Sequence, residues 1–322
     1  MVNANLFQDG SIGENVNPYL HLTLMKKIKH IKLYHAAKSG SLACFTYAYE
    51  VIGEIDDTTD DKYILSSAAR SGNIACLKYA FNIIKVKDVK NYTLCGAAES
   101  GNIACLKYAF RIIKSTDVLD LTLRNAAASG SLACLKYAHE VIKSSSNDWT
   151  LHNAAESGSF ACLKYTYEII GATDVQDNTL CSAALSGSLA SLKYAHEIIG
   201  AIDKNNWTLC SAAKSGSLEC LIYAYEVIGA IDVHNLTLCN AAKSGSLDCL
   251  KYAFCIIKAN DTHYNYTLCC AARSGNIACL KYAHNIIKVT DVHNYTLYYA
   301  AKSGSLECLK YAFNIIKLTD KY

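Results

Sequence analysis

Short and longer runs of apolar residues alternate along this chain at helical spacing. In residues 120–146 a first run places Leu123, Ala126 and Ala127 at i, i+3 and i+4, which predicts a helix of little more than two turns. A second run follows the tripeptide Ser-Gly-Ser and lines one face of a longer helix with Leu132, Cys134, Leu135, Ala138, Val141 and Ile142. The pattern therefore predicts two helices joined by a tight turn, with the paired alanines against a neighbouring helix.

The turn recurs ten times, at intervals of 28 to 32 residues and most often 29. Its glycines are Gly40, Gly72, Gly101, Gly130, Gly158, Gly187, Gly216, Gly245, Gly275 and Gly304. We expect a left-handed backbone at each glycine, which costs a residue with a Cβ roughly 1–2 kcal/mol. Ser or Asn follows every glycine and is interpreted as the N-cap of the second helix. A pair of helices this small cannot bury its own apolar face, so the period predicts a stacked array.

The start of each first helix has two candidate N-caps. Asp or Asn stands ten residues before the glycine in eight repeats, and a short side-chain oxygen there is suited to cap a helix. These residues are Asn91, Asp120, Asp148, Asp177, Asn206, Asn235, Asn265 and Asn294. Thr122, two residues after Asp120, is the alternative, and the sequence leaves both open.

The stretch TLRNAAASGSLACLKYA resembles the ankyrin repeat, whose pattern is Leu-x-x-Ala-Ala-x-x-Gly before an apolar second helix. The link GATDVQDN at 171–178 is similar to the Gly-Ala-Asp-Val-Asn link of that family. The period is shorter than the usual value of about 33, and the Thr-Pro-Leu-His opening has lost its Pro and His, the chain's single proline being Pro18. Such repeats look like the divergent ankyrin arrays of large DNA viruses and protists.

The resemblance implies an all-α solenoid of about ten helix–turn–helix ankyrin-like units with an abbreviated hairpin finger. We expect the array to occupy residues 31–322, after a polar N-terminal segment and a capping helix in residues 1–30. The last repeat keeps its full apolar stripe. An alternative function is therefore end-to-end self-association through this C-terminal face.

The charge and the cysteine content of the chain limit the classes of function and the cellular environment that we expect. The chain has 31 Lys+Arg against 28 Asp+Glu, so composition alone does not predict binding to nucleic acid or a membrane. No apolar run approaches the roughly 18 residues that span a bilayer. The polar, acidic N-terminus has no apolar signal-peptide region, and sixteen cysteines in such a chain indicate a reduced, intracellular protein. We expect the cytoplasm, or the host cytoplasm for a viral protein.

No catalytic or metal site is expected. The histidines fall at non-equivalent positions and the serines are caps, so we predict no enzyme activity and no cofactor. Cysteines within one repeat, such as Cys95 and Cys105, supply two ligands where zinc takes four, so buried packing is the interpretation. The Tyr that follows the second-helix Lys position is expected to pack with its hydroxyl in solvent, while Lys136, Lys164 and Lys193 pair weakly with the Glu four residues on.

Position −2, two residues before the turn glycine, varies while its neighbours do not. It reads Lys38, Arg70, Glu99, Ala128, Glu156, Leu185, Lys214, Lys243, Arg273 and Lys302. The ankyrin resemblance implies that this position lines a concave, partner-binding surface, where Glu99, Glu156 and the four final cations form candidate contacts. Those cations make a basic track about 30 Å long. Solubility is the alternative explanation of the charges.

Position −9 holds aromatic residues in several repeats: Tyr92, Trp149, Trp207, Tyr266 and Tyr295. Trp149 and Trp207 are candidate anchors near the concave surface, and packing between links is the alternative. The sequence thus predicts a protein-binding scaffold for an unidentified partner. A binder of acidic polymers or nucleic acid along Lys214–Lys302 is a less favoured alternative.

Overall fold

The computed structural model consists of helices joined by turns and short links in the part of the chain that it describes. These are residues 33–52, 61–83, 92–113, 120–143, 149–174, 177–257, 266–289 and 295–319. No strand occurs in these ranges, so the predicted all-α class is confirmed. The predicted segment and capping helix in residues 1–30 lie outside the described residues. The chain divides into two compact units, Met1–Ser115 and Thr116–Tyr322.

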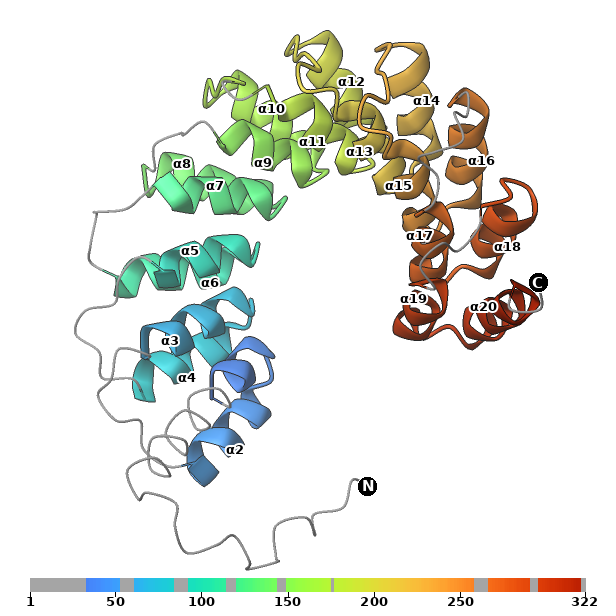
Figure 1. Cartoon of the computed structure of the whole chain (residues 1–322). Helices are drawn as coiled ribbons and strands as arrows, with labels where there is room; N and C mark the ends of the chain where they lie inside the picture. Colours follow the sequence, from blue (N-terminus) through green and yellow to red (C-terminus); the bar gives the residue numbers. More distant parts are fainter. Residues whose placement is uncertain are drawn as a thin grey trace, which may run out of the picture. The chain divides into compact units, whose positions relative to one another are not determined.

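Each repeat contributes an inner helix before the turn glycine and an outer helix after it (Figure 1). The inner helices of the first unit are α3 (Asp61–Arg70) and α5 (Tyr92–Glu99). Its outer helices are α2 (Leu42–Ile52), α4 (Ile74–Ile83) and α6 (Ile103–Ile112). Residues 33–38, before the first turn, are also helical.

The second unit stacks seven helix pairs. Its inner helices are α7 (Asp120–Ala128), α9 (Thr150–Glu156), α11 (Thr179–Leu185), α13 (Thr208–Ser215), α15 (Thr237–Ser244), α17 (Thr267–Ser274) and α19 (Tyr295–Ser303). Its outer helices are α8 (Leu132–Glu140), α10 (Phe160–Glu168), α12 (Leu189–Glu197), α14 (Leu218–Glu226), α16 (Leu247–Ile256), α18 (Ile277–Asn285) and α20 (Leu306–Thr319). Each inner helix contacts the next inner helix, and α9 to α19 follow the inside of the curve that this unit makes.

The core is a repeated layer of leucine, alanine and cysteine. In the pair α13–α14, Leu209, Ala212 and Ala213 of the inner helix are buried with Cys220 and Leu221 of the outer helix. The small alanines let neighbouring inner helices approach closely, and the leucines fill the space between the two rows. The predicted stripe of α8 is buried at Leu135, whereas Val141 is exposed, because the helix ends at Glu140 and Val141 is its C-cap.

The Ser-Gly-Ser turn is fixed by both serines. Ser129 Oγ donates to the carbonyl of Ala126 at 2.7 Å and accepts the N–H of Ser131 at 3.2 Å. Ser131 Oγ then accepts the N–H of Cys134, so it caps α8 as the sequence predicts. All ten turn glycines have φ between 70° and 79°. A side chain at Gly130 would be strained in that left-handed conformation.

Asparagine in place of the second serine adds a bond between repeats. Asn102 accepts the N–H groups of Ala104 and Cys105, so it caps α6 as serine does elsewhere. Its Nδ2 also donates to the carbonyl of Gly72 at 2.8 Å. Asn276 reaches the carbonyl of Gly245 at 2.9 Å in the same way. Ser and Asn are therefore both caps, and in the described repeats Asn also ties its turn to the preceding turn.

The predicted N-cap of the inner helices is wrong where the link is described. Asp203 Oδ1 accepts the N–H groups of Trp207 at 3.0 Å and Thr208 at 3.2 Å, and so caps α13. Asn206, the expected cap, instead has φ 56° and completes the turn from Asp203. Thr208 is helical and buried, so the alternative is also wrong there. Asp174 and Asp232 cap α11 and α15 in the same manner.

A tyrosine–glutamate ladder joins neighbouring outer helices of the second unit. Each tyrosine hydroxyl donates to a glutamate of the preceding repeat at 2.7–2.8 Å, in the pairs Tyr165–Glu140, Tyr194–Glu168, Tyr223–Glu197 and Tyr252–Glu226. The sequence predicts that these hydroxyls lie in solvent, and the structure adds a glutamate partner for each of them; the bonds of Tyr165 and Tyr252 are exposed, and those of Tyr194 and Tyr223 are partly buried. Lys136 and Lys193 lie over the rings of Tyr165 and Tyr223, and of the three expected Lys–Glu pairs only Lys164–Glu168 is formed, at 3.9 Å.

Candidate interaction surface

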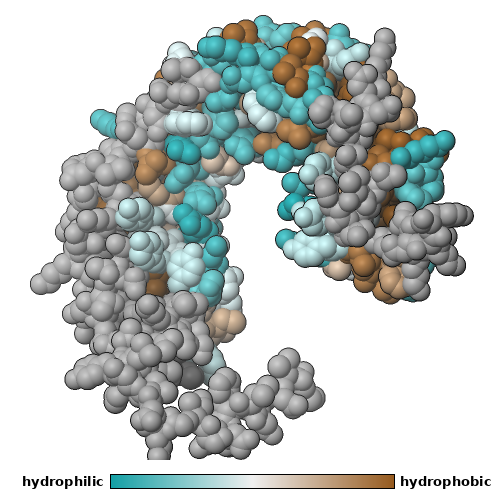
Figure 2. All heavy atoms as spheres, in the orientation of Figure 1, coloured by the Kyte–Doolittle hydropathy of each residue, from teal (hydrophilic) through white to brown (hydrophobic). Residues whose placement is uncertain are grey.

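One stripe of each inner helix faces away from the core. Positions −9 and −2 are seven residues apart, or about two helical turns, so both fall on the side opposite the buried leucine and alanines. Trp149 and Trp207 at position −9 are 39% and 40% exposed. In the second unit this inner stripe (positions −9 and −2) faces the inside of the curve, where Figure 2 shows mainly hydrophilic to weakly polar side chains.

The basic track predicted from the sequence lies on four successive inner helices. Lys214, Lys243, Arg273 and Lys302 are all exposed, near the C-terminal ends of α13, α15, α17 and α19. These helices contact one another in order. None of the four contains Asp or Glu. The structure thus brings the four cations together in a row that has no acidic side chain on its own helices.

Tyrosines flank the last two cations of the track. The Arg273 guanidinium carbon lies 5.6 Å from the ring centroid of Tyr299, and Lys302 Nζ lies 5.8 Å from that of Tyr298. Tyr298 is 57% exposed, and its ring meets that of Tyr299 edge-on at 5.1 Å. The sequence signal for this cluster is Tyr298-Tyr299, at a place where five other repeats begin with a cysteine: Cys95, Cys181, Cys210, Cys239 and Cys269. Cation–π contact holds the two charges beside an exposed aromatic surface.

Glu99 has a partner within the first unit. Arg70 Nη2 lies 2.8 Å from Glu99 Oε2, and both residues occupy position −2 on the neighbouring helices α3 and α5. The two charges neutralise each other, so this part of the stripe carries little net charge. The sequence places both residues on one surface, and the structure shows that they pair.

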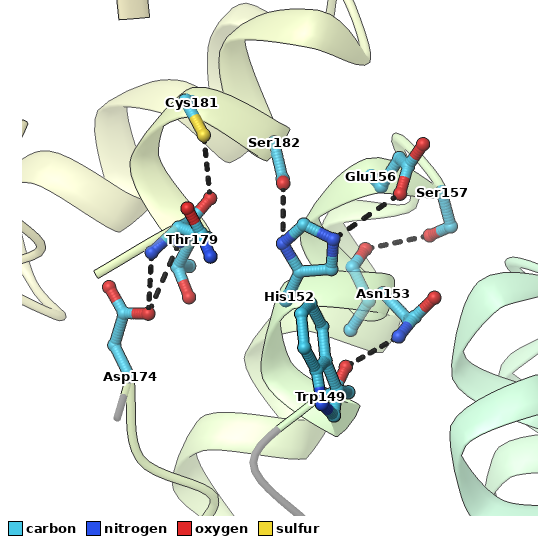
Figure 3. Close-up of polar contacts among 11 residues, drawn as sticks. Trp149, His152, Asn153, Glu156, Ser157, Asp174, Thr179, Cys181 and Ser182 are labelled. Atoms are coloured by element: carbon cyan, nitrogen blue, oxygen red, sulfur yellow. Dashed lines mark hydrogen bonds and ion pairs between the residues drawn. The ribbon is translucent and has the colours of Figure 1, made fainter. Parts of the chain in front are cut away.

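A polar cluster surrounds Glu156 on α9 (Figure 3). His152 Nδ1 and Ser182 Oγ are 2.7 Å apart, and His152 Nε2 lies 3.6 Å from Glu156 Oε2. The order of serine, histidine and carboxylate is that of a nucleophilic triad. Ser182 is only 3% exposed, so a substrate cannot reach its hydroxyl. The arrangement ties α9 to α11, and sequence reasoning missed it because the two residues lie in different repeats.

The two tryptophans contact neighbouring groups and keep part of each ring exposed. The Arg124 guanidinium carbon lies 5.6 Å from the ring centroid of Trp149, whose ring also meets His152 edge-on. Trp207 stacks on His234 of the next link, with ring centroids 4.0 Å apart and an angle of 16°. Both predicted roles fit these positions, because each ring packs at a repeat boundary and is 39–40% exposed on the inner stripe.

The cysteines pack mainly as buried thiols. Burial raises the pKa of Cys181 and Cys279 to about 11 and that of Cys210 to about 12. Cys239 differs, because a hydrogen bond from the Cys270 thiol lowers its pKa below the usual value of a thiol. Among the described residues no group of three or more His, Cys, Asp and Glu is arranged to hold a metal ion.

A row of aliphatic side chains is exposed at the other edge of the second unit. It follows the C-terminal ends of the outer helices and contains Val141, Ile169, Ile198, Val227 and Ile286. Hydrophobic side chains are visible along that outer edge in Figure 2. The sequence pattern assigns Val141 to the buried face, so this row could not be recognised before the helix ends were known.

The repeats also match a known family. The family model of ankyrin repeats matches residues 238–321 with three copies. Residues 238–321 therefore contain ankyrin repeats, as the sequence predicts, and the described helix pairs before that region show the same helix–turn–helix arrangement. Ankyrin repeats are generally protein–protein interaction modules, and the family is typically non-catalytic. No curated protein shows significant similarity to the chain. Among the described helices, none is long and apolar enough to cross a membrane.

Proposed function

We propose that this protein is a non-catalytic scaffold that binds a protein partner on the inner stripe of its second unit. The observation that carries the proposal is the exposed row of Lys214, Lys243, Arg273 and Lys302 on α13, α15, α17 and α19. Much of each repeat is used for packing or capping, whereas position −2 changes from repeat to repeat without affecting the core. Exposed residues that differ between otherwise uniform repeats are suited to recognition.

The stacking supports this role. Each inner helix contacts the next, and each described turn is closed by hydrogen bonds from its serines or asparagine. Such an array holds its exposed side chains at a fixed spacing, which lowers the conformational entropy lost when a partner binds. We further propose a reduced, intracellular environment such as the cytoplasm, because all sixteen cysteines are free.

Affinity capture tests the proposal. The wild-type chain is compared with a variant that changes Lys214, Lys243, Arg273 and Lys302 to Glu. A matched control changes four exposed lysines of the outer helices to Glu and alters net charge by the same amount: Lys193, Lys251, Lys281 and Lys310. A protein captured by the wild type and the control but lost from the inner-stripe variant supports the proposal. Capture that is equal in all three contradicts it.

Self-association through the last repeat is the second candidate. Leu306 and Phe313 of α20 are both exposed, while Cys308 and Ala312 are buried against the preceding helices. Analytical ultracentrifugation over a range of concentrations tests this function. A mass that rises with concentration, and that stays at the monomer value when Leu306 and Phe313 are changed to Ser, supports it.

A further inference from the structure

We propose that the basic track binds an extended, polyproline-II-like segment that carries an acidic side chain at every third residue. The basic track is the row Lys214, Lys243, Arg273 and Lys302. This inference rests on the proposed function and names the kind of partner that the inner stripe accepts.

The spacing of the track sets the register of the ligand. Equivalent positions on packed helices recur about every 8–10 Å, and the four cations occupy the same position on four helices in contact. A polyproline-II helix has three residues per turn and rises about 3.1 Å per residue, so i, i+3, i+6 and i+9 share one face about 9 Å apart. A β-strand instead places i and i+2 on one face, about 7 Å apart, and falls out of register.

An acidic ligand follows from the charge on these helices. None of α13, α15, α17 and α19 contains Asp or Glu, so the four cations have no carboxylate on their own helices. In the first unit the equivalent Arg70 is neutralised by Glu99 at 2.8 Å. A carboxylate on the ligand would play the part of Glu99 for each cation of the track.

Two other ligands match the track less well. An α-helix with acids at i and i+7 repeats every 10.5 Å or so, but it is a straight rod, and the inner helices follow the inside of a curve (Figure 1). Duplex DNA carries about one charge per 1.7 Å of its axis, much denser than the track. The chain's net charge of +3 supplies no wider basic field.

The exposed tyrosines at the α19 end of the basic track can bind apolar residues of the ligand that lie between its acidic side chains. Tyr298 is 57% exposed beside Lys302, and Tyr295 is exposed one turn earlier on α19. Polyproline-II segments bind through proline rings that pack on exposed aromatic side chains. We therefore place a proline or another apolar residue of the ligand on Tyr298, next to its terminal acid.

Fluorescence anisotropy with synthetic peptides tests the register. One twelve-residue peptide carries Glu at residues one, four, seven and ten among Pro, Ala and Ser, and its isomer of equal composition carries Glu at residues one, three, five and seven. At physiological salt we expect the first peptide to bind at least about tenfold more tightly, because only its carboxylates all meet the track. The variant K214E/K243E should lose this binding. The control K251E/K310E, which makes the same charge change on outer helices, should retain it.

Each remaining outcome overturns the proposal in a recognisable way. Equal binding of the two isomers means that charge alone is recognised. Tighter binding of a helical peptide with heptad-spaced Glu means that the ligand is an α-helix. Tighter binding of an oligothymidylate, lost in K214E/K243E, assigns the track to nucleic acid. If no peptide binds but affinity capture still yields a protein that the four-residue variant loses, the proposed scaffold function stands and this inference fails.

Discussion

Tyr194 donates a hydrogen bond of 2.8 Å from its hydroxyl to Glu168 Oε1 of the preceding repeat. The same bond recurs from Tyr165, Tyr223 and Tyr252. Burial of the ring and the bonded carboxylate raise the pKa of Tyr194 well above its usual value. The tyrosine that recurs in the outer helices therefore links one repeat to the next through these four bonds, in addition to the apolar core.

Removal of one hydroxyl should weaken this link. We expect Tyr194→Phe to lower the free energy of unfolding by about 1–2 kcal/mol, because the hydrogen bond to a charged carboxylate is lost. Urea denaturation followed by circular dichroism measures the change. Tyr282→Phe is the matched control, because Cys255 stands where Glu168 stands and no hydrogen bond from Tyr282 occurs among the described contacts. Equal losses in the two variants would contradict the role of the hydrogen bond.

High pH should unfold the array through the same tyrosines. Burial, together with the neighbouring glutamate, raises the pKa of Tyr165, Tyr223 and Tyr252 to about 12, while unfolded tyrosine has a pKa of about 10. The folded state therefore binds more protons than the unfolded state between these values. The contribution to stability is fully present below pH ~10 and is lost as the pH rises through ~12.

The urea midpoint measured at several pH values from 9 to 12 checks this expectation. Buried thiols such as Cys210 act in the same direction, since its pKa is also raised to about 12. The control is therefore the triple variant Tyr165→Phe, Tyr223→Phe and Tyr252→Phe, which keeps every cysteine. Its midpoint should fall less steeply with pH than that of the wild type. Parallel curves would show that these tyrosines do not cause the alkaline loss.

A substitution in the apolar core should destabilise the array locally. Leu135 of α8 is fully buried, so we expect Leu135→Ala to cost about 2–5 kcal/mol through lost burial and the cavity left behind. In a stacked array the effect is concentrated in the mutated repeat and its neighbours. Hydrogen exchange should increase first in α7–α10. Leu306→Ala is the control, because Leu306 is exposed and its loss should change stability by less than about 0.5 kcal/mol.

The helix starts show where sequence reasoning succeeds and where it stops. The outer-helix caps could be predicted, because Ser131 directly follows the turn glycine and only one local geometry fits. The inner-helix caps could not, because Asp203 lies five residues before Thr208 and reaches it only after Asn206 adopts a left-handed backbone. The residue type at Asn206 suits both roles, since asparagine caps helices and also tolerates positive φ.

Part of the candidate interaction surface could likewise be predicted from the sequence, and part of it could not. Position −2 could be assigned to an exposed stripe from helical spacing alone, and Lys214 and Lys243 lie there. Contacts between repeats need three-dimensional distances, so the Arg70–Glu99 pair and the Trp207–His234 stack appear only in the structure. Residues about 29 apart in the chain become neighbours, and single-helix periodicity carries no information on which of their side chains meet.

The cap assignment itself can be tested by substitution. Asp203→Ala removes the acceptor for the N–H groups of Trp207 and Thr208, and we expect a loss of about 0.5–2 kcal/mol in unfolding free energy. Asn206→Gly should change stability by only a few tenths of a kcal/mol, because glycine adopts the same left-handed backbone. Thermal or urea unfolding of both variants measures these changes in the free energy of unfolding and shows which residue is the cap. If Asp203→Ala left the free energy of unfolding unchanged, Asp203 would not be the residue that caps α13.

The Ser182–His152–Glu156 cluster offers a direct test for hidden catalysis. A triad serine reacts with fluorophosphonate probes only if its hydroxyl is reachable, and Ser182 is 3% exposed between α9 and α11. We expect no labelling of Ser182 in the folded protein, and we expect Ser182→Ala to lower stability by about 1 kcal/mol through the lost hydrogen bond to His152. Mass spectrometry after incubation with the probe, with heat-unfolded protein as a background control, measures the labelling. Stoichiometric modification of Ser182 in the folded state would contradict a purely structural role, because it requires both an open path to the hydroxyl and activation by His152.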